Sequence, residues 1–127
     1  MYEVATRFDT VQPGLDGLIE RVIDDSMLTR HVGGEGLFAT PSMILLMELA
    51  SHAAVENQLP EAHTTVGYEV CVRHLAPAKV GETVVVSARL TEIKGNHLVF
   101  NVECSKLDGD TLIGTGTHKR AIIPALV

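Results

Sequence analysis

The chain has 127 residues, of which 46% are hydrophobic, enough for one apolar core but too few for two ordinary domains. Its formal net charge of −6 argues against a nucleic-acid partner, because binding phosphates requires a basic surface. No stretch resembles a membrane span or the apolar core of a signal peptide. We therefore expect residues 1–127 to form a single cytoplasmic domain that contacts neither nucleic acid nor membrane.

The two cysteines, Cys71 and Cys104, both occur in strand-like segments and lack the spacing of a metal site. We interpret them as reduced core residues of an intracellular protein. The sequence also contains no Gly-rich phosphate loop and no nucleophile-elbow motif. We therefore expect neither a metal nor a cofactor.

The first third of the chain has the weakest pattern. Residues 2–12 and 17–23 could form strands, separated by a turn-rich stretch at 13–17. The following segment, 24–36, ends in three glycines within four residues, at 33–36. Such a run does not sustain a regular element, so it predicts a loop or a mobile lid.

One helix is clearly marked between Pro41 and residue 58. Thr40 is a suitable N-cap, Pro41 suits the first helical position, and Pro60 ends the pattern. The helix has almost no polar face, which predicts that it is buried.

Four strand-like segments follow, at about 64–75, 80–93, 97–107 and 111–123. Short turn-rich links between them are typical of an antiparallel meander. Alternation predicts an inward face for each of the first three strands, formed by Val66, Tyr68, Val70, Val72 and His74; by Val84, Val86, Ala88 and Leu90; and by Leu98, Phe100, Val102 and Cys104. Gly114 and Gly116 share a face of the last strand, which indicates close packing there. One central helix wrapped by a curved antiparallel sheet is an α+β hot-dog fold.

Two polar residues are conspicuous in this apolar framework. Glu48 lies within the apolar run 43–50 of the helix, and His74 ends a strand on the face that we expect to meet the helix. Each has an ordinary explanation, an ion pair for the carboxylate and a hydrogen-bonded core position for the imidazole. A carboxylate in such a helix must otherwise change its pKa or take part in chemistry. Their occurrence on two sides of one core favours a functional site.

Thr40 is either a simple N-cap or a functional hydroxyl beside the free N–H groups of the helix start, where a carbonyl could be polarised. Glu48 follows eight residues later, roughly 12 Å along the helix axis. One chain can hardly bring both side chains to one carbonyl carbon. Either the substrate spans that distance or a second chain completes the site, and we predict a composite site at a dimer interface.

The remaining histidines carry less information. His52 could pair with Glu48 at i,i+4, as a structural contact. His118 lies with Arg120 on the Gly-rich strand and is interpreted as structural or dimer-related. Three histidines in loop-like surroundings are expected to be solvated: His31, His63 and His97.

Five segments in order resemble the hot-dog thioesterases related to fluoroacetyl-CoA thioesterase. The resemblance runs from about Leu37 to Ile123 and rests on 38–43, 46–48, 65–67, 72–77 and 113–120, which read FATPSM, LME, TVG, VRHLAP and IGTGTHKR. In that family a Thr at the helix start, a Glu within the helix and a His ending the next strand form the catalytic set. These positions correspond to Thr40, Glu48 and His74.

The same resemblance implies that the Gly67 N–H helps to hold the thioester carbonyl. The CoA arm would also need basic contacts, for which Arg120 is a candidate, although a solvated face explains this residue equally well. The fluoroacetyl-specific enzyme carries an aromatic lid residue shortly before the helix. This chain reads Gly-Gly-Glu-Gly-Leu at 33–37, so the lid gate is absent or different here.

The sequence therefore predicts an acyl-CoA thioesterase that hydrolyses a small acyl-CoA to free acid and CoA as a homodimer, or as a tetramer. Glu48, with a pKa raised by burial, would act as general base or nucleophile. Thr40 would orient substrate or share in the nucleophilic step, and His74 would move the proton or stabilise developing charge. The alternative is a non-catalytic acyl-CoA-binding or sensing module on the same fold. A hot-dog dehydratase is less favoured, because the paired His/Asp pattern expected of that class is missing.

Overall fold

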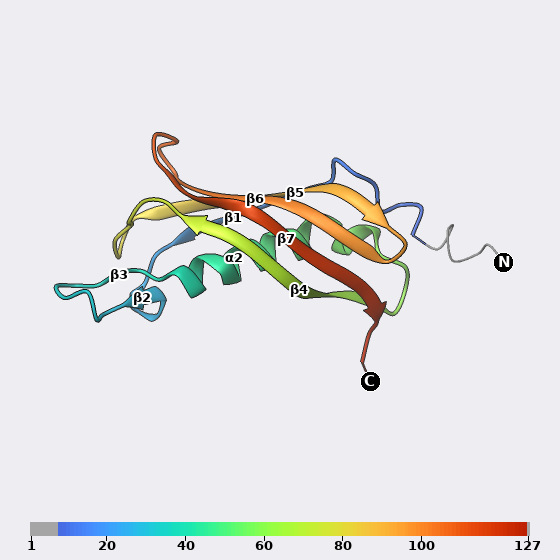
Figure 1. Cartoon of the computed structure of the whole chain (residues 1–127), viewed down its shortest axis with the longest axis horizontal. Helices are drawn as coiled ribbons and strands as arrows, with labels where there is room; N and C mark the ends of the chain where they lie inside the picture. The colour runs from blue at the N-terminus through green and yellow to red at the C-terminus, as the bar shows by residue number, and fades with distance from the viewer. Residues whose placement is uncertain (1–7, 127) are drawn as a thin grey trace.

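The computed structural model of the chain describes residues 8–126 and consists of one long helix lying against one face of a curved sheet (Figure 1). The helix, α2, spans Thr40–Val55. The sheet contains β1 (Asp16–Val22), β4 (His63–His74), β5 (Thr83–Lys94), β6 (His97–Lys106) and β7 (Leu112–Pro124). Four short elements flank the helix: η1 (Asp25–Met27), β2 (Leu28–Thr29), β3 (Leu37–Phe38) and η2 (Glu56–Gln58).

The sheet is antiparallel throughout, in the order β1-β5-β6-β7-β4. The predicted strands from β4 onward are all present, and β5, β6 and β7 form the expected meander. β4 departs from that meander because it pairs with β7 rather than with its sequence neighbour β5. β1 and β4 are therefore the two edges of the sheet. At the N-terminus, the strand predicted at 17–23 is β1, whereas residues 8–12 of the strand predicted at 2–12 form a turn and the remainder lies outside the described residues.

The core forms between α2 and the inward faces of β5 and β6. All eight residues predicted for those two faces are buried, which confirms both alternation patterns. The helix contributes seven buried residues: Met43, Leu46, Met47, Ala50, Ser51, Ala54 and Val55. The prediction of a fully buried helix is wrong on its other side, where Leu45 is 56% exposed and Leu49 is 43% exposed. The sheet of a single chain is too narrow to cover the whole circumference of α2.

The predicted inward face of β4 holds for only part of the strand. A β-bulge between Gly67 and Glu69 shifts the pairing with β7, so that Val70, Val72 and His74 face inward with the even-numbered residues of β7. Val66 and Tyr68, assigned to the same face by alternation, lie on the outer face and are exposed. A bulge adds one residue to a strand and thereby exchanges its two faces.

Glycines allow the helix to approach the sheet closely. A methyl group on Gly17 of β1 would overlap the carbonyl oxygen of Ala50 and lie 2.8 Å from the backbone nitrogen of Ala54. On β7, a methyl group on Gly114 would overlap Met43, and one on Gly116 would overlap the backbone of β4. The close packing predicted at Gly114 and Gly116 is confirmed.

The cysteines occupy different environments. Cys104 is buried on β6, and burial raises the pKa of its thiol to about 12. Cys71 is exposed on β4, so its assignment to the core is wrong, and both thiols are free. Within residues 8–126 no helix combines the length and apolar character that crossing a membrane requires.

Replacing Gly17 by Ala should destabilise the fold. The added methyl group meets helix backbone, which has no rotamer by which to move aside, and overpacking of this kind costs about 1–3 kcal/mol. The free energy of unfolding, measured in urea, should fall by that amount. Ser87→Ala, on the outward face of neighbouring β5, serves as the control and should change stability little. Equal stability of the two variants would contradict this packing.

Candidate functional site

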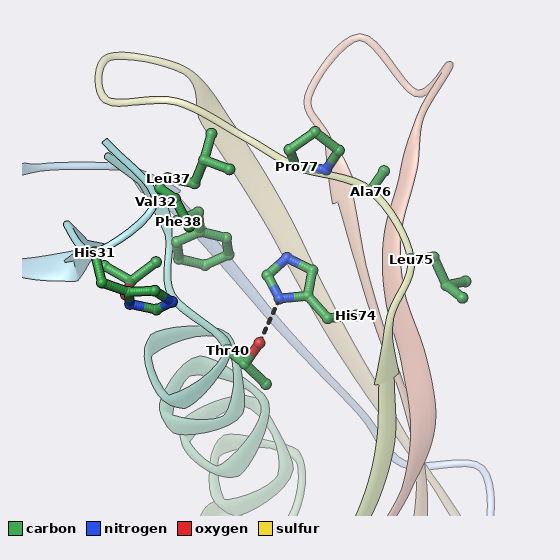
Figure 2. Close-up of a pocket in the computed structure, with 10 residues that line it drawn as sticks. His31, Val32, Leu37, Phe38, Thr40, His74, Leu75, Ala76 and Pro77 are labelled. Atoms are coloured by element: carbon green, nitrogen blue, oxygen red, sulfur yellow. Dashed lines mark hydrogen bonds between the residues drawn. The ribbon is translucent and has the colours of Figure 1, made fainter. Parts of the chain in front are cut away.

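The start of α2 and the end of β4 bring Thr40 and His74 together. Ala39 is the N-cap residue and makes no side-chain cap, and Thr40 is the first helical residue. The Thr40 hydroxyl instead lies 2.7 Å from Nδ1 of His74 (Figure 2). The prediction that Thr40 caps the helix is therefore wrong: its hydroxyl is engaged by a residue 34 positions away. A hydroxyl hydrogen-bonded to an imidazole is an arrangement that activates nucleophiles.

The imidazole of His74 is fixed on one side and free on the other. Phe38 packs edge-on against it, with 6.1 Å between ring centroids. The second ring nitrogen, Nε2, is buried and has no hydrogen-bond partner among the described residues. Leaving a buried polar atom unpaired costs about 1–3 kcal/mol, so the burial of this nitrogen is not offset by any hydrogen bond among the described residues.

Thr40 and His74 line a cavity of about 420 Å³ at the end of the molecule where the β2–β3 hairpin lies beside the helix start (Figure 2). This volume falls within the range of roughly 300–1,000 Å³ typical of small-molecule sites. The other lining residues are Thr29, His31, Val32, Leu37, Phe38, Leu75, Ala76 and Pro77.

Glu48 belongs to a second polar cluster, farther along α2. Its Oε1 lies 3.5 Å from Nη1 of Arg120, and its side chain is 36% exposed. The expected burial of Glu48 is therefore not found in the single chain. A Cβ on Gly67 would lie only 2.8 Å from Oε1, so the absence of a side chain there lets β4 pass directly beside the carboxylate.

Arg120 is buried beneath this carboxylate and held in place by Thr65. Its Nε donates to Thr65 Oγ1 at 2.8 Å, and its Nη2 donates to the Thr65 carbonyl at 3.0 Å. Burial lowers the pKa of the guanidinium, while the negative charge of Glu48 acts in the opposite direction. His52 takes part through Thr65 Oγ1, at 2.6 Å, and lies 3.5 Å from Glu56, so its expected pairing with Glu48 is wrong.

His118 completes the cluster as a neutral imidazole. It is 1% exposed, and its Nδ1–H donates to the carbonyl of Glu69 at 2.8 Å. Nε2 is then the acceptor for Nη1 of Arg120, 3.2 Å away. The pKa of His118 is lowered, chiefly by burial and also by the charge of Arg120, although the bond to Glu69 and the charge of Glu48 oppose this. The 4.0 Å approach of Nε2 to Glu48 is consequently not an ion pair.

The five predicted site residues thus form two groups within one chain. Thr40 is joined to His74, and Glu48 is joined to Arg120 beside Gly67, whereas the two groups are separated by about two helical turns, roughly 12 Å. Sequence reasoning missed Phe38 and Thr65 as supports of these groups. Phe38 lies two residues before Thr40, and Thr65 lies two residues before Gly67 on the inward face. Nothing in the sequence indicates that Phe38 contacts His74 or that Thr65 contacts Arg120.

Comparisons with known proteins identify the family of the chain. Residues 22–125 match the family model described as fluoroacetyl-CoA-specific thioesterase. The chain belongs to this family. A curated fluoroacetyl-CoA thioesterase from Streptantibioticus cattleyicolor is 40% identical over 87 residues, which cover 68% of this chain and 61% of that relative. The match therefore spans less than two thirds of the relative's length.

Solved structures confirm the predicted α+β hot-dog fold. A fluoroacetyl-CoA thioesterase superimposes with a TM-score of 0.79 at 32% identity, covering 89% of this chain and 88% of the other. A thioesterase superfamily member from Thermus thermophilus gives 0.80 at 33%, covering 90% and 85%. A hot-dog-like protein from Thermanaerovibrio acidaminovorans gives 0.80 at 20%, covering 91% and 86%, and supports the fold alone.

The lowered pKa of His118 predicts that stability falls on mild acidification. Because an ordinary histidine titrates near pH 6.5, the unfolded chain takes up a proton there while the folded chain resists. This contribution to stability is complete above about pH 6.5 and is lost as the pH falls through and below that value. In urea unfolding between pH 7.5 and 5.5, His118→Gln should show a weaker pH dependence than wild type, by up to about 1.4 kcal/mol per pH unit. His97→Gln is the control at an exposed histidine; equal slopes for the two variants would contradict the assignment.

Proposed function

We propose that this chain is an acyl-CoA thioesterase that hydrolyses a small acyl-CoA to the free acid and CoA, acting as a homodimer in the cytoplasm. The observation that carries the proposal is the Thr40–His74 hydrogen bond in the wall of a cavity, in a chain of this family. A solved variant of the related fluoroacetyl-CoA thioesterase holds acetyl-CoA, which supports an acyl-CoA as the substrate.

Hydrolysis adds water to the thioester carbonyl, breaks the C–S bond and returns a proton to the CoA thiolate. His74 moves the proton, because Nδ1 contacts the Thr40 hydroxyl and Nε2 has no partner among the described residues. Thr40 orients the substrate or shares in the nucleophilic step. The carbonyl is placed near the start of α2, where the positive end of the helix dipole favours developing negative charge.

Glu48 is the proposed general base toward water, or the nucleophile of an acyl-enzyme route. Arg120 supports either role by fixing the carboxylate, while Thr65 and His118 fix Arg120. The Gly67 N–H is the proposed donor to the thioester carbonyl, since its strand passes beside the carboxylate. In this proposal Arg120 affects the substrate only indirectly, by orienting Glu48. It does not bind the CoA arm from an exposed position.

A second copy of the chain is proposed to cover β4. This edge strand is 12 residues long, and its exposed residues include Val66, Tyr68 and Val70. Long apolar edge strands are normally paired or covered. Leu45 and Leu49 line a groove of about 250 Å³ that also contains Glu48 and Arg120. Covering this side would bury the exposed face of α2 that the sheet of one chain leaves open.

Antiparallel pairing of two β4 edges would also complete the site. Two-fold symmetry places the end of one strand beside the start of its partner. The His74 end of one chain would then lie beside the Thr65–Gly67 region of the other, where Glu48 is held. The Thr40–His74 pair of one chain and the Glu48 cluster of the other would face one thioester.

Glu48→Gln should fold and dimerise yet lose hydrolysis, because the amide cannot accept a proton at neutral pH. The expected loss in kcat is on the order of 10²–10⁴. The measurement is free-thiol release from a panel of short, medium, branched and aromatic acyl-CoAs. Glu56→Gln, at the exposed end of the same helix, is the matched control and should keep wild-type rates. Unchanged turnover by Glu48→Gln would contradict the role of Glu48. Wild type that binds CoA esters without releasing thiol would instead indicate the non-catalytic module.

Mixing two inactive variants tests whether the site is shared between chains. In a composite dimer, a Thr40→Val chain combined with a Glu48→Gln chain yields one site with both defects and one intact site. After unfolding and refolding together at equal amounts, about a quarter of the sites should be intact. Recovery of about a quarter of wild-type activity is expected from the mixture, against none from either variant refolded alone. No recovery, with mixed dimers demonstrated by mass spectrometry, would place the whole site within one chain.

A further inference from the structure

The cavity beside Thr40 contains a second Thr–His pair. Thr29 Oγ1 lies 2.8 Å from Nδ1 of His31, and both residues line the cavity together with Thr40 and His74. In Figure 2 the rings of His31 and His74 lie on opposite sides of Phe38. His31 was expected to be merely solvated. It is exposed, but its position in this wall gives it access to whatever the cavity holds.

The position of His31 is fixed by the β2–β3 hairpin. Leu28 pairs with Phe38 and Thr29 pairs with Leu37. This pairing fixes the two ends of the connecting loop, residues 30–36, relative to each other. The hairpin is joined to the rest of the fold by a backbone bond from the Phe38 N–H to the Ala78 carbonyl, 2.8 Å, and the bond from Ala39 to Met27, 2.8 Å, extends its own pairing by one residue on each side. His31 follows β2 by only two residues, and its contact with Thr29 limits the rotation of the ring. The imidazole is therefore held at the cavity wall by its own hairpin.

The charge of the cavity is unlike that of the chain. The chain carries 16 acidic residues, yet none of the ten residues that line this cavity is Asp or Glu. Its only ionisable groups are the two imidazoles. When the Thr29 hydroxyl donates to Nδ1 of His31, Nε2 carries the ring proton and is a free donor. The rest of the wall is apolar, formed by Val32, Leu37, Phe38, Leu75, Ala76 and Pro77.

We propose that His31 is a specificity-determining residue that selects acyl groups ending in a carboxylate, the CoA thioesters of short dicarboxylic acids. This inference rests on the proposed function, with the reacting carbonyl at Thr40 and His74 and the acyl tail in the cavity. The apolar wall accommodates the methylene groups, and His31 Nε2–H donates to the terminal carboxylate. Such charge-assisted bonds are about twice as strong as neutral ones, and no acid in the wall repels the anion.

The test compares esters of matched shape. Malonyl-CoA is paired with isovaleryl-CoA, and succinyl-CoA with 4-methylpentanoyl-CoA, because each apolar partner replaces the two carboxylate oxygens by methyl groups. The readout is the ratio of kcat/KM for the carboxylated ester to that for its apolar partner. His31→Phe should lower this ratio at least about tenfold. His31→Gln, which keeps an N–H donor, should retain part of it, and Thr29→Val should lower it less than His31→Phe does.

His97→Phe is the matched control, since this exposed histidine lies on β6 and does not line the cavity, and its ratio should equal that of wild type. An unchanged ratio in His31→Phe would overturn the proposal while leaving a thioesterase in place, as would a wild-type enzyme that hydrolyses only the apolar esters. If wild type releases thiol from no ester, the proposed hydrolysis fails. In that case the same four esters are used as ligands, and their dissociation constants are measured by calorimetry. A preference for the carboxylated ester over its apolar partner that is tenfold lower in His31→Phe than in wild type supports the subsite. An equal preference in the two proteins overturns it.

Discussion

The close approach of α2 to the sheet determines both the fold and the geometry of the site. Three strands meet the helix at a glycine: Gly17 at the backbone of Ala50 and Ala54, Gly67 at Glu48, and Gly114 at Met43. His74 pairs directly with Gly114, so the absence of a side chain that admits Met43 also sets the first turn of the helix beside His74. The Thr40–His74 bond and the space for Glu48 are consequences of this packing rather than additions to it.

The sequence predicted those elements whose position depends only on neighbouring residues. The helix and the strands β5, β6 and β7 follow from alternation and turn residues, and the inward faces of β5 and β6 were confirmed residue by residue. β4 was predicted as a strand, but the exchange of its faces at the bulge was not, because Gly67-Tyr68-Glu69 reads as an uninterrupted alternation. The capping role assigned to Thr40 failed for a related reason: its partner, His74, is distant in sequence.

Glu48 and His74 were selected as candidates from their chemistry and Gly67 from the family resemblance, whereas the grouping of these residues required the structure. Glu48 was noticed as a carboxylate in an apolar helix, but composition does not reveal which side of a helix a sheet leaves open. The structure shows that this side carries Glu48, and that the carboxylate is compensated by Arg120 rather than by solvent alone. A buried guanidinium requires such a partner, together with acceptors such as Thr65, or its desolvation is uncompensated. The ion pair therefore serves the stability of Arg120 and the orientation of Glu48 at once.

The polar residues around the cavity and along α2 differ in how firmly the fold fixes their positions. Thr40 and Glu48 stand on the long helix, and His74 ends the edge strand β4 beside the helix start, so all three lie on packed elements whose displacement disturbs the core. His31 stands on the exposed loop of the β2–β3 hairpin, whose strand β3 contributes Phe38 to the core, and it is followed by the glycines at 33–36. Loops tolerate substitution more readily than packed elements do. Under the proposal made above, a cavity wall built on this hairpin can change the acyl group that is recognised without moving Thr40, Glu48 or His74, so the proposed specificity lies on the hairpin.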